Sequence, residues 1–451
     1  MCFFQAVLLA GYAYAHALER WLSPRQMILT HLAVMGLALL VLPVSIASGW
    51  NRPPAEGAQF WLLGLLGASI GLPFFALSAN GPLLQAWFAR TGHRHAEDPY
   101  FLYGASNVGS LLALLAYPVF LEPYLTLGDQ STLWTAGYMI LIMLIAASAV
   151  HMLYHHGPVA PALPAHETAE SRPSWRTQIV WAGLAFIPSG LLVAVTTHIS
   201  TDVAAAPFLW VVPLALFLLT FVITFQRRPL LKQRWMLAMQ PLLVALLLVV
   251  LPFSIHLNWL FSLALNLGAF FITAMVCHGE LVRRRPVAGH LTRFYLWMSL
   301  GGMLGGVFTS LIAPYVFSTV IEYPMLILAG LLVRPGFWTA TARTWWRGLL
   351  AAAAVFVVMT GPKLLAGYEL AEEQPVLYYA GLLALGSIIF LSRQQPVRLA
   401  LMAAVLALSS HILQPEITKG ESLRGFFGVN KVVTTPDGAF RLLFHGTTLH
   451  G

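Results

Sequence analysis

Long apolar runs recur along this chain, and they constrain its fold more than any single motif does. Of the 451 residues, 58% are hydrophobic and 9% are charged, whereas soluble domains carry roughly 25% charged residues. The mean hydropathy is +0.75. About fourteen runs approach the roughly 20 residues that a membrane-spanning helix needs, centred near residues 9, 36, 69, 113, 142, 188, 215, 245, 268, 304, 327, 354, 384 and 405. The sequence therefore predicts an all-α polytopic membrane protein embedded in a lipid bilayer.

The basic residues between these runs alternate along the chain. If each connection is numbered by the helix before it, the odd connections hold Arg20, Arg25, Arg90, Arg94, Arg172, Arg176, Arg227, Arg228, Lys232, Arg234, Arg283, Arg284, Arg285, Arg293, Arg334, Arg343, Arg347, Arg393 and Arg398. Only Arg52 and Lys363 lie in the even connections. Because cytoplasmic loops are rich in lysine and arginine, the odd connections are predicted to face the cytoplasm. The net charge of +8 then needs no nucleic-acid partner, and we expect a multi-pass protein of a bacterial inner membrane.

The stretch from Leu291 to Pro324 has a second copy about 190 residues upstream. Each copy begins with aromatic residues, continues with small residues spaced four apart, and ends in a segment with proline and glutamate. Small residues at this spacing let two membrane helices approach closely. The predicted helix-packing residues are Gly301, Gly302, Gly305 and Gly306 in the later copy, and Ser106 and Gly109 in the earlier copy. An internal duplication of apolar segments is typical of secondary transporters.

The duplication predicts the domain organisation. Residues 1–154 form a first transmembrane half whose first helix would precede Met1, and residues 155–177 form a cytoplasmic linker. Residues 178–333 form a second half of six helices, and residues 334–413 add further hydrophobic helices. Two six-helix halves joined by a cytoplasmic linker are the facilitator layout. Residues 414–451 contain a Pro436-Asp437-Gly438 turn signal between strand-like segments, which predicts a short β-hairpin opening a truncated soluble domain.

Five motifs in order resemble the membrane-fused spermidine synthase family. They are TTHISTDVAAAPFLWVVPLALFLLTFVI from Thr196, CHGELVRRRP from Cys277, FYLWMSLGGMLGG from Phe294, EYP from Glu322 and FRLLFHGTTLHG from Phe440. In that family, a facilitator-like transmembrane region precedes a polyamine aminopropyltransferase domain. The resemblance therefore implies a role in polyamine biosynthesis or transport, and a downstream or adjacent enzyme domain as partner.

The enzyme core of the family is missing from this chain. The resemblance implies a glycine-rich turn for decarboxylated S-adenosylmethionine and acidic residues beyond it, but no residues remain after His450 and Gly451 to supply them. We therefore assign no catalytic residue, cofactor or metal to this chain. Cys2 and Cys277 both lie in apolar runs and do not indicate a disulfide framework.

His198 and Asp202 are the candidate substrate or proton site. On a helix they would share one face at i and i+4, and ionisable residues near the membrane are functional candidates by default. The charge pattern puts them at the outer surface, where a solvated structural cap is the alternative. His278 and Glu280, beside the run of arginines at Arg283, are interpreted as a salt-bridged helix end.

Two main hypotheses for the function remain open. The leading one is a membrane module of a fused spermidine synthase-like protein that anchors the enzyme domain and handles a polyamine or related small cation. The alternative is a free-standing secondary transporter of facilitator type. A purely structural scaffold is a third hypothesis. The enzyme domain's substrate is made in the cytoplasm, whereas fourteen spans would leave residues 414–451 outside. Because the last three apolar runs are the weakest, we hypothesise that one does not cross and that the hairpin faces the cytoplasm.

Overall fold

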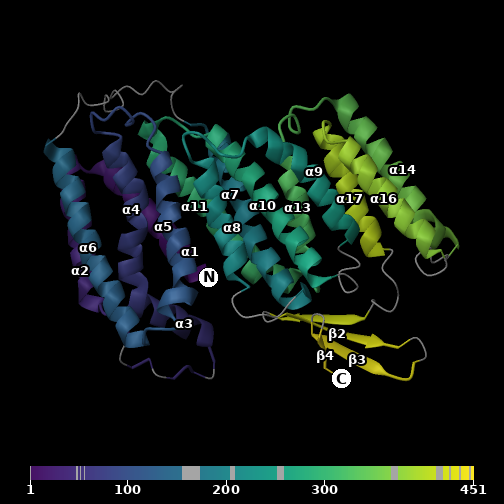
Figure 1. The fold of residues 1–451 in the computed structure, drawn as a ribbon, viewed down its shortest axis with the longest axis horizontal. Helices are drawn as coiled ribbons and strands as arrows, with labels where there is room; N and C mark the ends of the chain where they lie inside the picture. Colours follow the sequence, from purple (N-terminus) through teal and green to yellow (C-terminus); the bar gives the residue numbers. More distant parts are fainter. Residues whose placement is uncertain are drawn as a thin grey trace. The chain divides into compact units, whose positions relative to one another are not determined.

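The computed structural model describes residues 2–46, 49–50, 52–54, 56–154, 173–203, 209–250, 258–366, 374–412, 420–425, 428–435, 438–445 and 448–450, and it is mostly helical (Figure 1). Its α-helices are α1 (Cys2–Trp21), α2 (Pro24–Ala38), α3 (Ala58–Leu66), α4 (Leu72–Phe88), α5 (Phe101–Ala116), α6 (Leu127–Tyr154), α7 (Trp175–His198), α8 (Val211–Thr224), α9 (Gln233–Val250), α10 (Trp259–Arg283), α11 (Leu291–Val307), α12 (Ala313–Val316), α13 (Glu322–Leu332), α14 (Ala342–Ala366), α16 (Pro375–Leu391) and α17 (Pro396–Ile412). The strands are β1 (Glu421–Gly425), β2 (Gly428–Thr434), β3 (Arg441–His445) and β4 (Thr448–Leu449).

Every apolar run identified in the sequence lies in a helix. Among the described residues, 9 helical segments are long and apolar enough to cross a membrane, and four further apolar helices are shorter. The segments near residues 354, 384 and 405 were the weakest candidates for membrane spans in the sequence. They form α14, α16 and α17, of 25, 17 and 17 residues. The fold class is therefore mostly helical, as the sequence predicted.

The chain forms two compact units that differ from the halves expected from the sequence. Unit 1 contains residues 1–186, 221–228 and 281–304, and unit 2 contains residues 187–220, 229–280 and 305–451. The added helices and the C-terminal sheet thus belong to unit 2. The expected linker falls largely on residues 155–172, which lie outside the described residues.

The core of unit 1 lies between α1, α2, α4 and α6. Met27 and Met35 of α2, Leu83 and Trp87 of α4 and Ile145 of α6 are among its buried side chains. The aromatic residues that open the two copies of the repeat also meet in unit 1. The ring of Tyr295 lies 6.0 Å from that of Tyr100 and 5.0 Å from that of Tyr103, and Phe294 packs edge-on against Tyr100 at 5.7 Å.

The two copies of the repeat share a backbone irregularity. Helix α5 continues into a π-helical segment at Tyr117–Leu121, and α11 continues into another at Phe308–Ile312. Pro118 lies inside the first segment and Pro314 lies just after the second. Proline lacks the N–H that a regular helix uses and crowds the preceding turn, and π-bulges of this kind are rare. Two further π-helical segments, at Gly67–Gly71 and Ile199–Val203, lie outside the two copies, so the duplication stays a prediction.

The small-residue strips of the two copies differ in burial. Gly301, Gly305 and Gly306 are buried and Gly302 is half-buried. A Cβ at Gly301 would overlap the backbone of Ala182, so the two helices approach closely there. Ser106 and Gly109 are instead exposed, because α5 turns Gly104 and Asn107 inward. The packing expected at Ser106 and Gly109 is therefore absent from the described structure.

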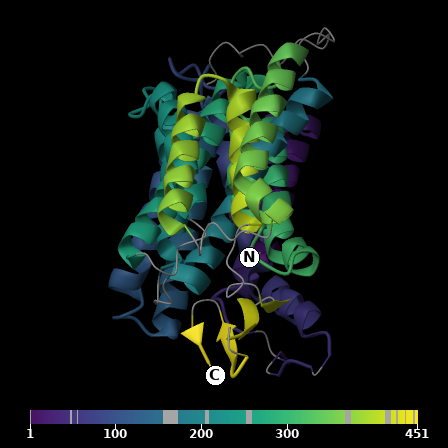
Figure 2. The ribbon, with the colours of Figure 1, turned by 90° about the vertical axis from the view of Figure 1, so that its right-hand side faces the viewer.

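In unit 2, the added helices pack on α9 and α13. Helix α17 contacts α9, α13 and α14, while α16 contacts α9. Figure 2 shows α14, α16 and α17 side by side. A Cβ at Gly330 of α13 would overlap the Thr273 side chain of α10, so these two helices also approach closely.

The C-terminal residues form an antiparallel sheet in the order β1-β2-β3-β4. The hairpin predicted from the sequence is β2–β3, with Thr434 opposite Arg441 and Val432 opposite Leu443. Gly438, with φ of 70°, provides the left-handed turn conformation that glycine adopts easily. Pro436 and Asp437 lie outside the described residues. The sheet is larger than the predicted hairpin because β1 and β4 extend it on either side.

Candidate functional site

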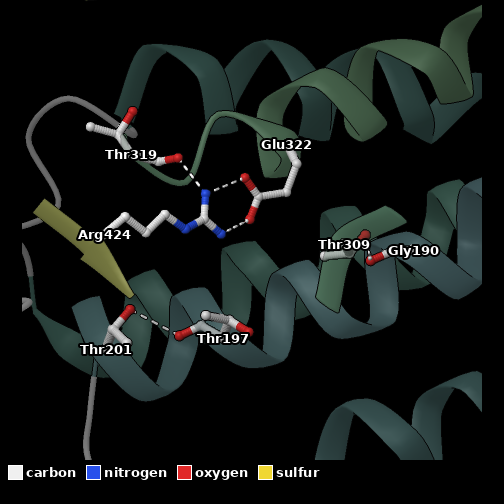
Figure 3. Close-up of polar contacts among 7 residues, drawn as sticks. All are labelled: Gly190, Thr197, Thr201, Thr309, Thr319, Glu322 and Arg424. Carbon is white, nitrogen blue, oxygen red and sulfur yellow. Dashed lines mark hydrogen bonds and ion pairs between the residues drawn. The ribbon is translucent and has the colours of Figure 1, made fainter. Parts of the chain in front are cut away.

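A buried ion pair joins the C-terminal sheet to the helices of unit 2. The side chains of Arg424 on β1 and Glu322 on α13 are 6% and 1% exposed. Arg424 Nη2 donates to Glu322 Oε1 at 2.6 Å, and Nη1 donates to Oε2 at 2.9 Å. Nη1 also donates to the carbonyl oxygen of Thr319 at 2.5 Å (Figure 3). The planar guanidinium therefore binds the carboxylate through two parallel hydrogen bonds, which is the strong and directional form of this interaction.

The local sequence explains where the carboxylate lies. Glu322 is the first residue of α13, and Pro324 follows within the first turn. Proline is tolerated there because the first N–H groups of a helix have no intrahelical partner. A carboxylate at a helix N-terminus also interacts favourably with the helix dipole. The sequence therefore starts a helix at Glu322 and places its charge where the dipole favours it.

Beside Glu322, a second buried cluster contains His198. The hydroxyl of Tyr323 donates to Asn266 Oδ1 of α10 at 2.6 Å. The His198 ring stacks on the Tyr323 ring with centroids 5.0 Å apart and an interplanar angle of 21°. Asn266 Nδ2 in turn donates to the Ser262 carbonyl at 2.8 Å. All four side chains are buried, so the structure sets His198 in a polar, aromatic cluster.

The proposed partner of His198 is only partly located. Asp202 lies in the π-helical segment Ile199–Val203 that extends α7, but its side chain is outside the described part of the chain. The pairing of His198 with Asp202 therefore stays a prediction. The hydroxyls near it are part of the helix, since Thr201 Oγ1 donates to the Thr197 carbonyl at 2.9 Å (Figure 3).

Buried polar residues continue along α10 from this cluster. Ser262, Asn266 and Thr273 are spaced so that they share one helix face, and they are 3%, 3% and 0% exposed. Among the described residues, no hydrogen-bond partner is present for Thr273 Oγ1. Gln240 of α9, also fully buried, donates to the Gly330 carbonyl of α13 at 3.0 Å. We call Ser262, Asn266, Thr273 and Gln240 the polar line of unit 2.

The polar line ends at a second buried arginine. Arg334, two residues beyond α13, is 8% exposed. Nη1 donates to Gln240 Oε1 at 3.0 Å and to the Leu237 carbonyl at 2.8 Å, while Nη2 donates to the Arg393 carbonyl at 2.8 Å. Burial lowers the pKa of Arg334 to about 10, so the side chain still carries its charge at neutral pH.

Other candidates from the sequence are less informative. His278 and Glu280 are 1% and 3% exposed, and His278 Nδ1 lies 2.8 Å from the Thr220 hydroxyl. Both residues are thus buried, and the salt bridge expected at this helix end stays a prediction. Within the described residues, no group of three or more histidine, cysteine, aspartate or glutamate side chains could hold a metal ion.

The sequence did not identify the residues that complete this site. Glu322 and Tyr323 were named there only as part of the EYP motif. Arg424 could not be paired with Glu322 because 102 residues separate them. Asn266 carried a weak signal, an amide in the middle of an apolar run, which is uncommon in a membrane helix.

Comparison with known proteins gives no relative for this chain: no protein-family model, curated protein or solved structure matches it. The functional argument therefore rests on the geometry of unit 2 and on the sequence motifs.

Proposed function

We propose that this chain is a multi-pass membrane module that anchors a C-terminal soluble domain. The apolar surface of its helices supports the membrane part of the proposal. On α6, Ile140, Met143 and Leu144 are 52%, 62% and 60% exposed, and on α14 Val357 and Val358 are 62% and 73% exposed. Apolar faces of this kind would be unfavourable in water and are what a lipid-facing helix needs.

The Arg424–Glu322 ion pair is the observation that carries the anchoring function. It fixes a strand of the sheet to the first turn of α13, and both charges are removed from water. Breaking a buried pair by removing one partner costs about 3–5 kcal/mol. Because the pair is this costly to break, it would hold the sheet against the helices.

The opposite face of the sheet supports a following domain. Leu423 of β1 is 75% exposed, and the cross-strand pair Val432 and Leu443 is 37% and 41% exposed. Because apolar side chains on one sheet face normally pack against a second layer, this face is suited to further residues of a soluble domain. By the family resemblance, that domain would be a polyamine aminopropyltransferase.

The contacts in unit 2 favour a side of the membrane that differs from our sequence hypothesis. Arg334, in a basic connection, binds the Arg393 carbonyl at the end of α16. The sheet binds Glu322, at the opposite end of α13. Helix α17 therefore leads from the Arg334 end to the Glu322 end. With the arginine-rich end in the cytoplasm, we place the sheet on the non-cytoplasmic side.

This placement bears on the activity. It separates the sheet from a nucleotide-derived substrate made in the cytoplasm, which weakens the aminopropyltransferase expectation. The alternative function, transport of a small molecule by a facilitator-type module, is favoured by the polar line, because buried polar residues within spans commonly mark a substrate or ion path.

Protease protection in membrane vesicles tests the anchor. Glu322→Gln is expected to expose the sheet to an added protease, since it leaves Arg424 without its carboxylate. Glu122→Gln is the matched control and should leave the sheet protected, because Glu122 is an exposed glutamate in the segment that ends the earlier copy of the repeat. Equal protection in both variants would contradict the anchoring proposal.

A reporter fused after Gly451 that is active only outside the cytoplasm tests on which side of the membrane the sheet lies. An inactive reporter would restore the cytoplasmic placement.

A further inference from the structure

The two partners of the Glu322 ion pair belong to different parts of unit 2. The acceptors, the Glu322 carboxylate and the Thr319 carbonyl, lie three residues apart at the start of α13. The donor, Arg424, lies on a strand of the small sheet. The acceptors thus form a preformed group of oxygens on the helical part, and the cation is supplied by a separate element.

A buried carboxylate is stable only when a cation or water interacts with it. An isolated carboxylate is strongly disfavoured away from water, and the Glu322 side chain is only 1% exposed. If the sheet leaves, another cation must take the place of the guanidinium or the site must open to solvent. The three acceptor oxygens are arranged for the N–H donors of a guanidinium, because Arg424 binds all three of them.

The surroundings add a second feature of a binding site. Tyr323 follows Glu322 directly, and its ring is stacked on His198 while its hydroxyl is bound to Asn266. An aromatic ring next to a carboxylate is a combination that stabilises organic cations.

From these contacts we propose that Glu322 and the Thr319 carbonyl form a binding site for a small organic cation with guanidinium or primary ammonium N–H donors, and that Arg424 is its built-in occupant. The cation and the sheet then compete for one site. This proposal rests on the anchoring function proposed above, and it adds that the anchor is released by a soluble cation.

Chemical rescue tests the site on the full chain in detergent or lipid discs. Arg424→Ala removes the built-in occupant, and we expect it to lower the thermal unfolding midpoint. Guanidinium chloride or butylammonium chloride at low millimolar concentration should raise that midpoint, whereas sodium chloride at equal ionic strength should not. The double variant Glu322→Gln/Arg424→Ala should not respond to either organic cation. No rescue of Arg424→Ala, or an equal response in the double variant, would overturn the proposal.

A competition measurement covers the case in which Arg424→Ala does not fold. In the unaltered chain, millimolar guanidinium should speed protease cleavage of the sheet by about tenfold or more, since it replaces one partner of the buried pair. If guanidinium leaves cleavage unchanged while Glu322→Gln still releases the sheet, the cation site is contradicted and the anchoring function is not. If Glu322→Gln also leaves the sheet protected, the anchoring function fails instead.

Discussion

Two buried arginines lie near opposite ends of α13, and they are held in different ways. Arg424 meets a carboxylate and comes from a small sheet. Arg334 meets three uncharged oxygens, from Leu237, Gln240 and Arg393, that belong to α9 and to the segment after α16. One arginine is paired with a carboxylate and lies on the small sheet, and the other is enclosed by packed helices.

The difference indicates what each arginine does. Carbonyl oxygens near a helix C-terminus carry partial negative charge, so the Arg393 carbonyl stabilises the Arg334 guanidinium without a formal counterion. Because the acceptors of Arg334 lie on α9 and just after α16, freeing its guanidinium requires these segments to move away from α13. Arg424 can reach water when the sheet alone moves away. Arg334 therefore stabilises the unit as a whole, whereas Arg424 controls one attachment.

The largest expected effect on unfolding of the whole unit is that of Arg334→Met. Methionine fills much of the volume but leaves the three acceptor oxygens without their donor, and each buried unsatisfied group costs about 1–3 kcal/mol. We expect the free energy of unfolding to fall by roughly 2–4 kcal/mol after partial relaxation. Denaturation in detergent measures it, with Arg347→Met, at an exposed position on α14, as the control. A loss no larger than that of the control would remove the distinction between the two arginines.

Reversal of the ion pair is expected to have the next largest effect. Glu322→Arg alone puts two guanidinium groups together, and it should release the sheet completely. Adding Arg424→Glu restores opposite charges, although the helix dipole now meets an arginine, so we expect partial recovery of protection. The overall unfolding midpoint should change less than for Arg334→Met, because sheet release limits the cost. If the reversed pair gives no recovery over the single variant, the two residues are not coupled.

Tyr323→Phe tests the cluster beside the ion pair and should have a smaller effect. It removes one hydroxyl and leaves Asn266 Oδ1 without that donor, which costs about 1–2 kcal/mol. The stacked His198 ring keeps its aromatic partner. Thermal unfolding measures the loss, and protection of the sheet should be unchanged. Release of the sheet by this variant would mean that the cluster and the ion pair act as one site.

The sequence could predict the helices of this fold but not the contacts of its site. Apolar periodicity and length identified the segments because each helix satisfies its own backbone hydrogen bonds. The buried face of a helix depends on its neighbours, and for that reason the strip at Ser106 and Gly109 was expected to pack and is exposed. Glu322 and Arg424 carried charges that are common at helix ends and in strands, and no local pattern records which distant charge is the partner.

The smallest expected effect comes from Thr273→Val, midway along the polar line. Thr273 Oγ1 is fully buried and has no hydrogen-bond partner in the part of the chain that the structure describes, so the hydroxyl contributes a desolvation cost. Valine keeps the branched shape and the close contact with Gly330. We expect unfolding stability to be unchanged or raised by up to about 1 kcal/mol. A clear loss of stability would show that the hydroxyl has a structural partner. Uptake of butylammonium into vesicles gives a second measurement. If stability holds while uptake falls, the polar line serves transport and connects the two ends of α13. Unchanged uptake would favour the anchor as the function of unit 2.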